Sequence, residues 1–316
     1  MPETLPPGYE HAVEPAASRL EVLVVGYSSI DFVWHATSPP APGRTSLLIG
    51  NVDPAPRFGG CGPNVAVELA RLGHEVGLAS WIGDDEYGRR YLAYLMAAGI
   101  DTRGVKVAAG QASPRTLLVY DPDGSATCLY HPSGSHSQQL SAGTARLARA
   151  VHAIALTVGP APLTRAIVAA RGPEQVLAWA VKADADAYPP DLRRDLMAAA
   201  HVVCLNRDEV AFLAQALAPR SEDPFATIRR ACRGLLVVTA GSDDCQVAQG
   251  DGWASVPVDH VQLADSTGGG DAFFAALLDA HLAGADPLGA ATAATRHAAD
   301  FLRSRALTDN SEGVPP

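Results

Sequence analysis

The segment Gln262–Leu278, with the sequence QLADSTGGGDAFFAALL, joins a glycine run that has an acidic residue at each end to an apolar stretch. The apolar stretch has the composition of a buried helix and is expected to end at Gly284. The backbone N–H groups of glycines 268–270 then lie at a helix N-terminus, where unpaired donors and the helix dipole favour an anion. Asp271 is expected in the first turn of this helix, beside that anion.

A carboxylate beside a bound anion is unfavourable unless it accepts a proton from a group that attacks the anion. Transfer of a phosphoryl group to a hydroxyl requires both features, because donors must stabilise the charge on the transferred group and a base must take the proton of the alcohol. The segment therefore predicts phosphoryl transfer. A simple turn is the alternative interpretation, since short glycine motifs have many false matches.

Outside this segment, short apolar runs rich in Val, Leu and Ile alternate with stretches of helical periodicity. Two helical stretches are residues 62–73, with Pro63 at the expected first helical position, and residues 84–99, and both end at a glycine. The apolar runs are residues 20–26, 75–83, 153–159, 176–181, 201–206 and 234–241. This alternation predicts an α/β fold, a three-layer sandwich whose mainly parallel central sheet is covered by helices on both faces. Such sheets bind ligands at the C-terminal ends of their strands.

Two segments interrupt this alternation. Residues 32–58 and 114–135 contain strand-like patches with Pro and Gly turns but no helix, and the second contains the hairpin signal DPDG. We expect a small antiparallel β lid built from both segments. Because no repeat or change of composition marks a second domain, one domain is expected over residues 19–307, between a disordered leader, 1–18, and a flexible tail, 308–316.

The composition of the 316 residues limits the classes of partner. Hydrophobic residues make up 47% of the chain, which is enough for a sizeable core. The formal charge is −10 and no basic patch could follow a phosphate backbone, so a nucleic-acid partner is not expected. Lys106 and Lys182 are the only lysines, and an anionic ligand would therefore be held mainly by arginine, backbone N–H groups or a metal.

The five cysteines are odd in number and form no C-x-x-C pair, which predicts reduced thiols. The N-terminal sequence lacks the basic start and apolar core of a signal peptide, and no apolar run is long enough to cross a bilayer. A cytoplasmic protein without a membrane partner is therefore expected. The chain has no H-x-x-x-H pair that would predict zinc and no G-x-S-x-G motif that would predict a hydrolase.

A second glycine-rich segment, Arg57–Ala66 (RFGGCGPNVA), precedes one of the helical stretches. Its glycine spacing does not fit the dinucleotide fingerprint, and the chain has no G-x-x-x-x-G-K-[ST] motif. A tight turn is the simplest interpretation. The alternative is that the glycines let a ligand approach the backbone while the amide of Asn64 binds adjacent sugar hydroxyls.

Taken together, these motifs resemble the two signatures of the PfkB carbohydrate kinase family, whose fold is ribokinase-like. GGCGPNVAVELARLG (59–73) is similar to the first signature and DSTGGGDAFFAALL (265–278) to the second, and VVGYSSID (24–31), NRDE (206–209) and VVTAG (237–241) stand in the expected order. Ser266 and Gly269 replace the Thr and Ala that the family commonly has. The resemblance covers nearly the whole chain and implies a kinase that uses ATP and Mg²⁺.

The resemblance also implies roles for individual residues. The catalytic group would comprise Asp271 as base, with Gly268, Gly269 and Gly270 as the anion hole for the transferred phosphoryl group. The other groups would be Asp31, Gly59, Gly60 and Asn64 for substrate hydroxyls, Asn206, Thr239, Gly241, Gly268 and Gly270 for ATP, Asn206 and Glu209 for Mg²⁺ through water, and Asp265 and Thr267 for a monovalent cation such as K⁺.

Three further side chains stand near these residues in the predicted fold. By strand alternation His35 shares a face with Asp31, which makes it a candidate for substrate contact, whereas Trp34 faces the other way and suits packing or a homodimer formed through the lid. Lys182 follows a predicted strand and could reach a phosphate, but a surface or structural role is the favoured interpretation.

Three functions remain open from the sequence. The leading hypothesis is an ATP-dependent phosphotransferase that acts on a hydroxyl of a sugar or sugar-like molecule. The alternatives are a nucleoside kinase of the same fold and a non-catalytic sugar-binding regulatory protein. A dehydrogenase is disfavoured because the dinucleotide fingerprint is missing. The sequence leaves open the identity of the acceptor, the hydroxyl that reacts, whether the acceptor already carries a phosphate, and the oligomeric state.

Overall fold

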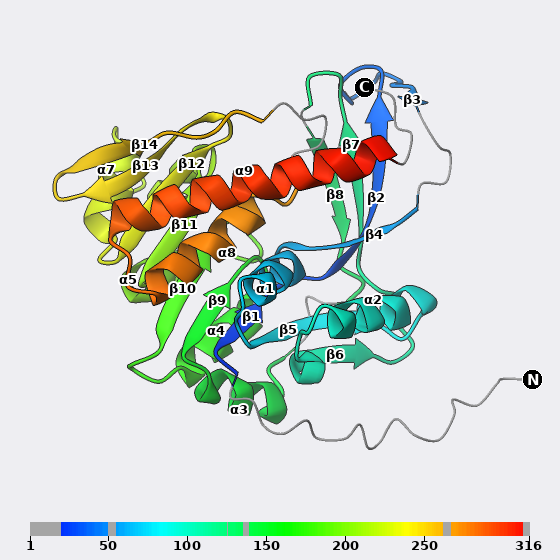
Figure 1. Ribbon diagram of the computed structural model, residues 1–316, viewed down its shortest axis with the longest axis horizontal. Coiled ribbons are helices and arrows are strands. Elements are labelled where there is room, and N and C mark those ends of the chain that lie inside the picture. Colours follow the sequence, from blue (N-terminus) through cyan, green and yellow to red (C-terminus); the bar gives the residue numbers. More distant parts are fainter. Residues whose placement is uncertain (1–19, 50–54, 125, 135–138, 262–266, 312–316) are drawn as a thin grey trace, which may run out of the picture.

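The computed structural model of the chain describes residues 20–49, 55–124, 126–134, 139–261 and 267–311. The strands of its large sheet are β1 (Val22–Val25), β5 (Val76–Gly83), β6 (Val105–Ala108), β9 (Ala153–Leu156), β10 (Val176–Ala180), β11 (Val202–Asn206), β12 (Leu235–Ala240), β13 (Asp243–Gln249) and β14 (Gly252–Val256). Among the described residues these nine strands lie in the order β14-β13-β12-β11-β10-β9-β1-β5-β6 (Figure 1).

The predicted parallel sheet is confirmed. All six predicted apolar runs form strands, and every pairing from β6 across to β12 is parallel. Each residue of β1 is buried, because helices cover both faces of the sheet at its centre. The sequence did not reveal β6 or the antiparallel edge hairpin of β13 and β14, since β13 mixes polar with apolar residues as half-exposed strands do.

Helices form the two outer layers, each with its own apolar core. One face of the sheet packs against α1 (Cys61–Arg71), α2 (Glu86–Ala97), α8 (Gly269–Leu282) and α9 (Pro287–Ser311), and α1, α8 and α9 lie together in front of the sheet in Figure 1. The other face packs against α3 (Ala142–Ala150), α4 (Ala161–Ala170), α5 (Pro190–Ala199), α6 (Glu209–Leu217) and α7 (Pro224–Ala231). A short 3-10 helix, Thr102–Gly104, precedes β6.

Helix α1 begins two residues earlier than predicted, at Cys61 instead of Pro63. Gly60 precedes it with a φ of 98°, a left-handed conformation that favours glycine, and so the helix starts directly after the glycine pair. Pro63 is accommodated because the first N–H groups of a helix have no intrahelical partner. Asn64 is therefore in the first turn, where its N–H donates to the carbonyl of Gly60 at 3.0 Å.

The predicted lid forms a second, smaller sheet beside the large one (Figure 1). Its strands are β2 (Ser29–Ala36), β3 (Leu48–Ile49), β4 (Arg57–Gly59), β7 (Arg115–Tyr120) and β8 (Ala126–His131), in the order β3-β2-β7-β8 with β4 paired to β2. The DPDG hairpin between β7 and β8 is present. The prediction of a purely antiparallel lid was wrong, because β2 and β7 each follow a strand of the parallel sheet and run outward in the same direction.

Residues 1–18, predicted to be a disordered leader, lie outside the described residues. Helix α9 continues to Ser311, so residues 308–311 of the predicted tail are helical. Within the described part of the chain, no helix combines the length and the apolar composition that crossing a membrane would require.

Candidate active site

Three cavities lie around the C-terminal ends of the parallel strands. The large cavity, of about 860 Å³, lies between the ends of β11 and β12 and helices α8 and α9. The lid cavity, of about 360 Å³, lies between β2, α1 and the C-terminal half of α9. The central cavity, of about 120 Å³, contains Asp271 and shares Lys182, Asn206, Thr239 and Gly270 with the large cavity. A ligand in the large cavity can therefore reach Asp271.

The glycine turn before α8 places a left-handed residue directly before the helix. Gly268 has a φ of 85°, in the left-handed region, and α8 begins at Gly269. Gly269 and Gly270 line the large cavity, and Gly268 lines the lid cavity. The first N–H groups of α8 thus lie between the two cavities, and Asp271 is in the first turn of the helix as predicted.

Asp271 makes a direct contact between the two glycine-rich segments. Asn64 Nδ2 donates a hydrogen bond to Asp271 Oδ2 at 2.8 Å, which joins α1 to α8. Burial raises the pKa of Asp271 from 3.8 to about 6, while the Asn64 hydrogen bond and the positive charge of Lys182 act in the opposite direction. A carboxyl group with such a pKa is ionised at neutral pH and is still basic enough to accept a proton.

Asp31 is the second carboxylate of the site. It is 8% exposed and lines the lid cavity, and its Oδ1 is buried without a hydrogen bond to any described residue. Burial raises the pKa of Asp31, and hydrogen bonds with Ser29 and Thr116 partly offset this. Because buried polar atoms are normally paired, Oδ1 is a ready acceptor for a hydroxyl of a ligand in the lid cavity.

Gly59 and Gly60 are required by close approaches of the chain. A methyl group at Gly59 would lie 1.9 Å from Asp31 Oδ2, and one at Gly60 would lie 2.4 Å from the carbonyl oxygen of Tyr27. Gly59 also lines the lid cavity. The two glycines therefore let β4 pass beside the Asp31 carboxylate and start α1 with Asn64 facing the same cavity.

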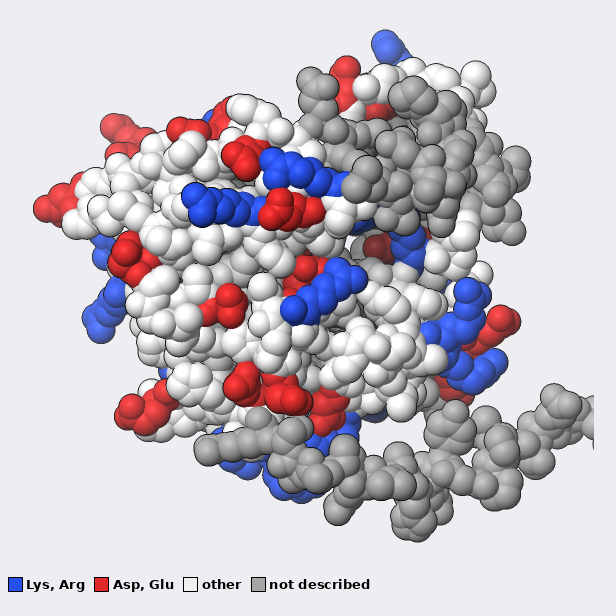
Figure 2. Space-filling model, in the orientation of Figure 1, with Lys and Arg blue, Asp and Glu red and all other residues white. Residues whose placement is uncertain are grey.

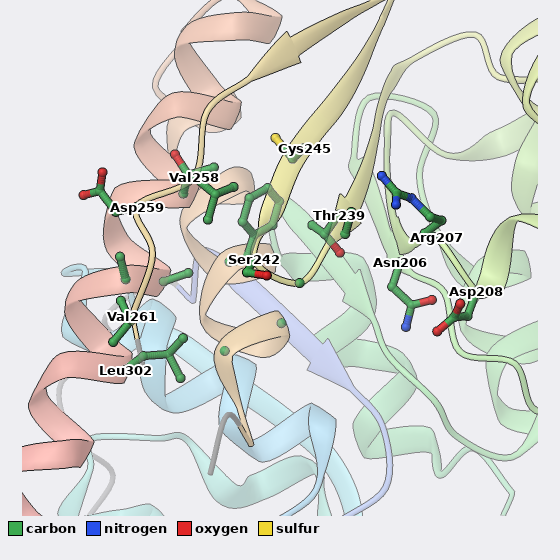
Figure 3. Close-up of a pocket in the computed structure, with 18 of the residues that line it drawn as sticks. Asn206, Arg207, Asp208, Thr239, Ser242, Cys245, Val258, Asp259, Val261 and Leu302 are labelled. Carbon is green, nitrogen blue, oxygen red and sulfur yellow. The ribbon is translucent and has the colours of Figure 1, made fainter. Parts of the chain in front are cut away.

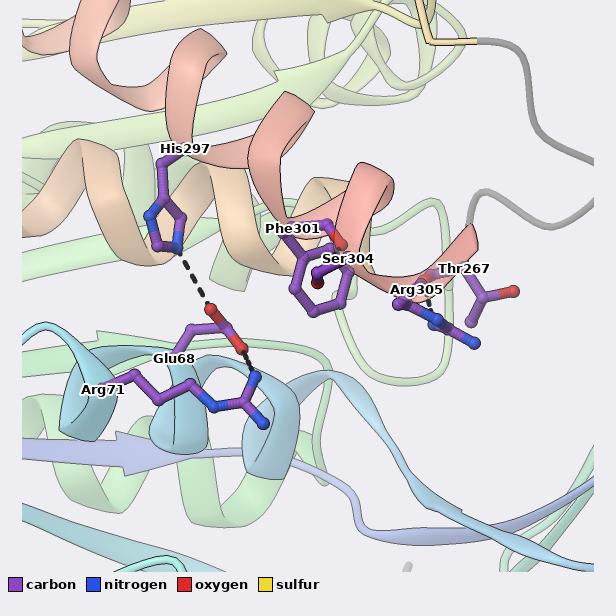
Figure 4. Close-up of polar contacts among 7 residues, drawn as sticks. All are labelled: Glu68, Arg71, Thr267, His297, Phe301, Ser304 and Arg305. Atoms are coloured by element: carbon purple, nitrogen blue, oxygen red, sulfur yellow. Dashed lines mark hydrogen bonds and ion pairs between the residues drawn. The ribbon is translucent and has the colours of Figure 1, made fainter. Parts of the chain in front are cut away.

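The far wall of the lid cavity contains a polar cluster between α1 and α9 (Figure 4). Glu68 of α1 is buried, its Oε2 lies 3.1 Å from His297 Nε2 of α9, and its Oε1 accepts from Arg71. Arg305 of α9 donates to the carbonyl oxygen of Thr267, next to the glycine turn. None of these contacts was predicted, although Glu68 is the one charged residue in the apolar stripe of its helix and could have drawn attention.

The large cavity has two unlike sides (Figure 3). Asn206, Arg207 and Asp208 lie on one side, and Val258, Val261 and Leu302 on the other. Thr239 and Gly241, which the resemblance assigned to ATP, also line this cavity, with Gly241 in the turn that follows β12. A ligand with a flat apolar part and a polar, charged part fits such a cavity.

Asn206 and Glu209 hold each other in place at the start of α6. The N–H of Asn206 donates to Glu209 Oε2 at 2.8 Å, and the N–H of Glu209 donates to Asn206 Oδ1 at 2.9 Å. Glu209 is 5% exposed and lines the central cavity, and burial raises its pKa while the N–H of Asn206 and the charge of Lys182 lower it. The described residues contain no cluster of three or more metal-binding side chains, and a metal here would need other ligands as well.

Lys182 lies in the site instead of on an unrelated surface. Lys182 is exposed, and it forms part of the wall that the large and central cavities share. Desolvation lowers the pKa of Lys182, but the neighbouring Cys61, Glu209 and Asp271 raise it above its usual value, so the ammonium group stays charged. A surface or structural role stays a prediction for this lysine, and the structure adds that it lines both cavities.

Three predicted positions are placed differently from the rest. The ring of His35 stacks on Tyr120 at a centroid distance of 5.7 Å, and His35 lines none of the three cavities. The hydroxyl of Thr267 contacts that of Tyr120, and Thr267 lines the lid cavity. Asp265, its proposed partner for a monovalent cation, lies outside the described residues.

Comparison with known proteins identifies the family of the chain. A model of the pfkB family of carbohydrate kinases matches residues 19–312. The chain belongs to the pfkB family. It is 28% identical over 284 residues to fructokinase-1 of Zea mays, with 83% of each chain covered, and 25% identical over 271 residues to a nucleoside kinase of Methanothermobacter thermautotrophicus, with 84% of each covered.

Solved structures show the same fold. The crystal structure of a ribokinase from Cryptococcus neoformans in complex with ADP matches with a TM-score of 0.73 at 20% identity, and the match covers 90% of this chain and 94% of the ribokinase. The fold of this pfkB family member is therefore ribokinase-like, as predicted. As a member of this family, the chain is a phosphotransferase with a hydroxyl group as acceptor.

Proposed function

We propose that the chain transfers the γ-phosphoryl group of ATP to a hydroxyl of a sugar or sugar-like molecule, with Asp271 as the base. The hydrogen bond between Asn64 and Asp271 carries this proposal. Asn64 lines the lid cavity and Asp271 lines the central cavity, so the base lies where an acceptor in one cavity meets a nucleotide in the other. Such positioning is a large part of catalysis in phosphoryl transfer.

In this mechanism the hydroxyl oxygen of the acceptor forms a bond to the γ-phosphorus. The bond from that phosphorus to the bridging oxygen breaks, and its electron pair leaves with ADP. Asp271 takes the hydroxyl proton, which its pKa of about 6 permits at neutral pH. The N–H groups of Gly268, Gly269 and Gly270 stabilise the charge on the transferred group.

ATP is proposed to lie in the large cavity. Val258, Val261 and Leu302 offer an apolar wall for the adenine ring, and Asn206 and Thr239 lie toward the end where the phosphates would meet Gly270. The ADP complex of the Cryptococcus ribokinase supports a nucleotide as the ligand of this fold. Gly241 in the turn after β12 would lie beside the nucleotide.

Asn206 and Glu209 fit a role in holding Mg²⁺ through water. Mg²⁺ keeps several waters and commonly takes one or two carboxylates together with substrate phosphates, and Glu209 brings a buried carboxylate to the central cavity. When bound, Mg²⁺ would neutralise phosphate charge. Glu209 and Asn206 would orient its water ligands, and their mutual hydrogen bonds fix both side chains in advance.

We also propose that Asp265 and Thr267 bind a monovalent cation such as K⁺. The guanidinium of Arg305, which donates to the Thr267 carbonyl, already brings a fixed positive charge to this turn. Titration of activity with KCl, using NaCl and choline chloride at equal ionic strength, tests the proposal. Activity that is the same in all three salts would contradict a K⁺ site.

The acceptor is proposed to bind in the lid cavity, where Asp31, Asn64 and the backbone at Gly59 and Gly60 would contact its hydroxyls. This polar end of the cavity favours a sugar. Phe58, which lines the same cavity and stacks within the Tyr91 and Tyr94 cluster, favours the nucleoside alternative because a base needs a flat apolar surface. The Methanothermobacter relative is named a nucleoside kinase, which supports the same alternative.

ADP release measured on a panel of pentoses, hexoses, their monophosphates and nucleosides tests the function. We expect turnover of at least one sugar, and loss of that turnover in the Asp271→Asn variant. Preferential turnover of nucleosides would contradict the sugar hypothesis and favour a nucleoside kinase. Sugar binding by calorimetry without ADP release on any member of the panel would contradict a kinase and favour a regulatory sugar-binding protein.

The remaining proposals concern assembly and location. Leu117 and Leu129 face each other across β7 and β8, and both are exposed on the lid face opposite the lid cavity, which supports a homodimer formed through the lid. Light scattering of the wild type and of Leu129→Glu tests the dimer.

Positive and negative side chains are mixed on the face of the molecule that Figure 2 shows, and they form no continuous basic patch there, which supports a small-molecule partner. The five unpaired cysteines support a cytoplasmic location.

A further inference from the structure

We propose that Lys182 is a second catalytic residue of this kinase, whose ammonium group binds the phosphoryl group while it passes from the nucleotide to the acceptor. The proposal rests on the kinase function and assigns a contact to a residue outside both glycine-rich segments. Lys182 itself gains and loses no proton in the step. It supplies a positive charge to the oxygens of the transferred group, whose negative charge must be stabilised throughout.

The backbone at Lys182 is fixed by the sheet. Lys182 stands two residues after β10 ends at Ala180, and the intervening Val181 donates its N–H to the carbonyl of Cys204 in β11 at 2.8 Å. The Lys182 carbonyl accepts from the N–H of Asp184 at 2.8 Å. The side chain therefore starts from an anchored position at the C-terminal edge of the sheet, and only its flexible stem adapts to a ligand.

The location of Lys182 matches the path of the transferred group. This group starts on a nucleotide in the large cavity and must pass the Asp271 carboxylate in the central cavity. Lys182 lines both cavities, as do Gly270 and Asn206. Among the described residues that line both, Lys182 is the only one with a positive charge. Its ammonium group can therefore stay in contact with the phosphoryl group on both sides of the transfer.

The charges at this place need a cation. Asp271 and Glu209 bring two carboxylates to the central cavity, and a nucleotide adds a polyphosphate. Arg207 lines only the large cavity and donates to Asp243 at 3.2 Å. The side chain of Lys182 makes no hydrogen bond or ion pair within the described part of the chain. A lysine held next to two carboxylates without pairing to either is well placed to bind an incoming phosphate.

The chain offers a matched control, because its other lysine is remote from all three cavities. Lys106 is exposed on β6, the edge strand at the opposite end of the large sheet from the nucleotide cavity. With two lysines in the chain, chemical modification can be followed at each one by peptide mass spectrometry. Lys182 reports on a bound phosphate, and Lys106 reports on the general reactivity of lysine in the same sample.

The first experiment is reductive methylation of the wild-type protein, with and without Mg²⁺ and a non-hydrolysable ATP analogue. We expect the analogue to slow methylation of Lys182 about tenfold when it is present at ten times its Kd, and to leave Lys106 unchanged. Methylation of Lys182 at the same rate in both samples would overturn the proposal. Because the wild type is used, this result does not depend on the folding of a variant.

The second experiment compares Lys182→Met, Lys182→Arg and the control Lys106→Met on the best acceptor of the panel. Loss of one charge that stabilises the transition state is expected to lower kcat about 10²- to 10³-fold in Lys182→Met, with partial rescue by Lys182→Arg and no change in Lys106→Met. The acidic limb of the kcat profile should move to higher pH in Lys182→Met, because the charge of Lys182 holds the pKa of Asp271 down.

The two experiments also separate this inference from the kinase proposal. A wild type that phosphorylates an acceptor while Lys182→Met keeps kcat within about threefold would overturn the role of Lys182 alone. A wild type without turnover on the whole panel would contradict the kinase function. In that case protection of Lys182 by the ATP analogue would still support the phosphate contact, and absence of protection would overturn it as well.

Discussion

Replacing Asp271 by asparagine is expected to stabilise the folded chain at neutral pH while it removes most of the activity. The carboxylate lies in a partly buried place and is charged at neutral pH, which opposes folding. Asparagine carries no charge to desolvate, has nearly the same shape and keeps an oxygen that can accept the hydrogen bond from Asn64. Asp271 is therefore expected to be a site where function and stability conflict.

The size of the effect follows from the pKa. Burial raises the pKa of Asp271 from 3.8 to about 6, so the folded state binds this proton more tightly than the unfolded state. The resulting stability is fully present below pH 3.8 and is lost as the pH rises through about 6. At about 1.4 kcal/mol per pH unit, the ionised carboxylate costs about 3 kcal/mol at pH 7.5 and about 1 kcal/mol at pH 4.5.

Urea unfolding at 25 °C, followed by tryptophan fluorescence and circular dichroism, measures this difference. Asp271→Asn should unfold at a higher urea concentration than the wild type at pH 7.5, by up to about 3 kcal/mol in free energy, and the gain should shrink by more than half at pH 4.5. Asp195→Asn on α5, whose side chain is 69% exposed, is the control and should change the free energy of unfolding by less than about 0.5 kcal/mol.

Two results would refute this reasoning. One is an Asp271→Asn variant that is no more stable than the wild type at pH 7.5, which would mean that the carboxylate is well solvated in the folded state. The other is a gain that is equal at both pH values, because a desolvated charge must lose its cost on protonation. The same variant should have a kcat lower by about 10²- to 10⁴-fold, measured as ADP release.

Three further changes test other parts of the site. Gly270→Ala adds a methyl group with no atom within 4 Å, so the chain should fold, but the methyl lies at both cavities and should lower kcat/KM about 10²-fold in steady-state assays. Gly269→Ala, whose methyl would meet the Leu302 side chain at 3.3 Å, should retain activity, and equal losses in both variants would contradict the anion hole. Gly59→Ala must displace the Asp31 carboxylate and should raise the acceptor KM about 10- to 100-fold without affecting the ATP KM, and a change in the ATP KM alone would contradict the acceptor assignment. Glu209→Gln should raise the Mg²⁺ concentration for half-maximal activity about 10- to 100-fold in a titration at fixed ATP, whereas an unchanged titration would remove Glu209 from the metal site.

Much of the fold could be predicted because its signals are local. Strands buried on both faces of a parallel sheet need nearly continuous apolar runs, and all six such runs form strands. The edge hairpin of β13 and β14 escaped prediction because a half-exposed strand needs no such run. The lid was recognised from its turns, but the parallel pairing of β2 with β7 depends on where each strand leaves the large sheet.

The candidate site shows the same division. The glycine turn and Asp271 were found from the sequence, because a left-handed residue before a helix and an acid in its first turn lie within a few positions of each other. The place of Lys182 in one cavity with Gly270 and Asp271 could not be predicted, because these residues are distant in sequence. Glu68 and His297 are 229 positions apart, and the charged Glu68 in an apolar stripe gave no indication of its partner.

Local sequence patterns predict the alternation of strands and helices, the two glycine turns and the acid that follows the second, because each depends on the conformational limits and burial of neighbouring residues. No local pattern predicts that Asn64 meets Asp271, that Lys182 lines the wall between two cavities, or that Asp31 keeps a buried oxygen without a hydrogen bond to any described residue. The physical reason is that contacts between distant segments depend on how the layers pack, and packing is a property of the whole chain.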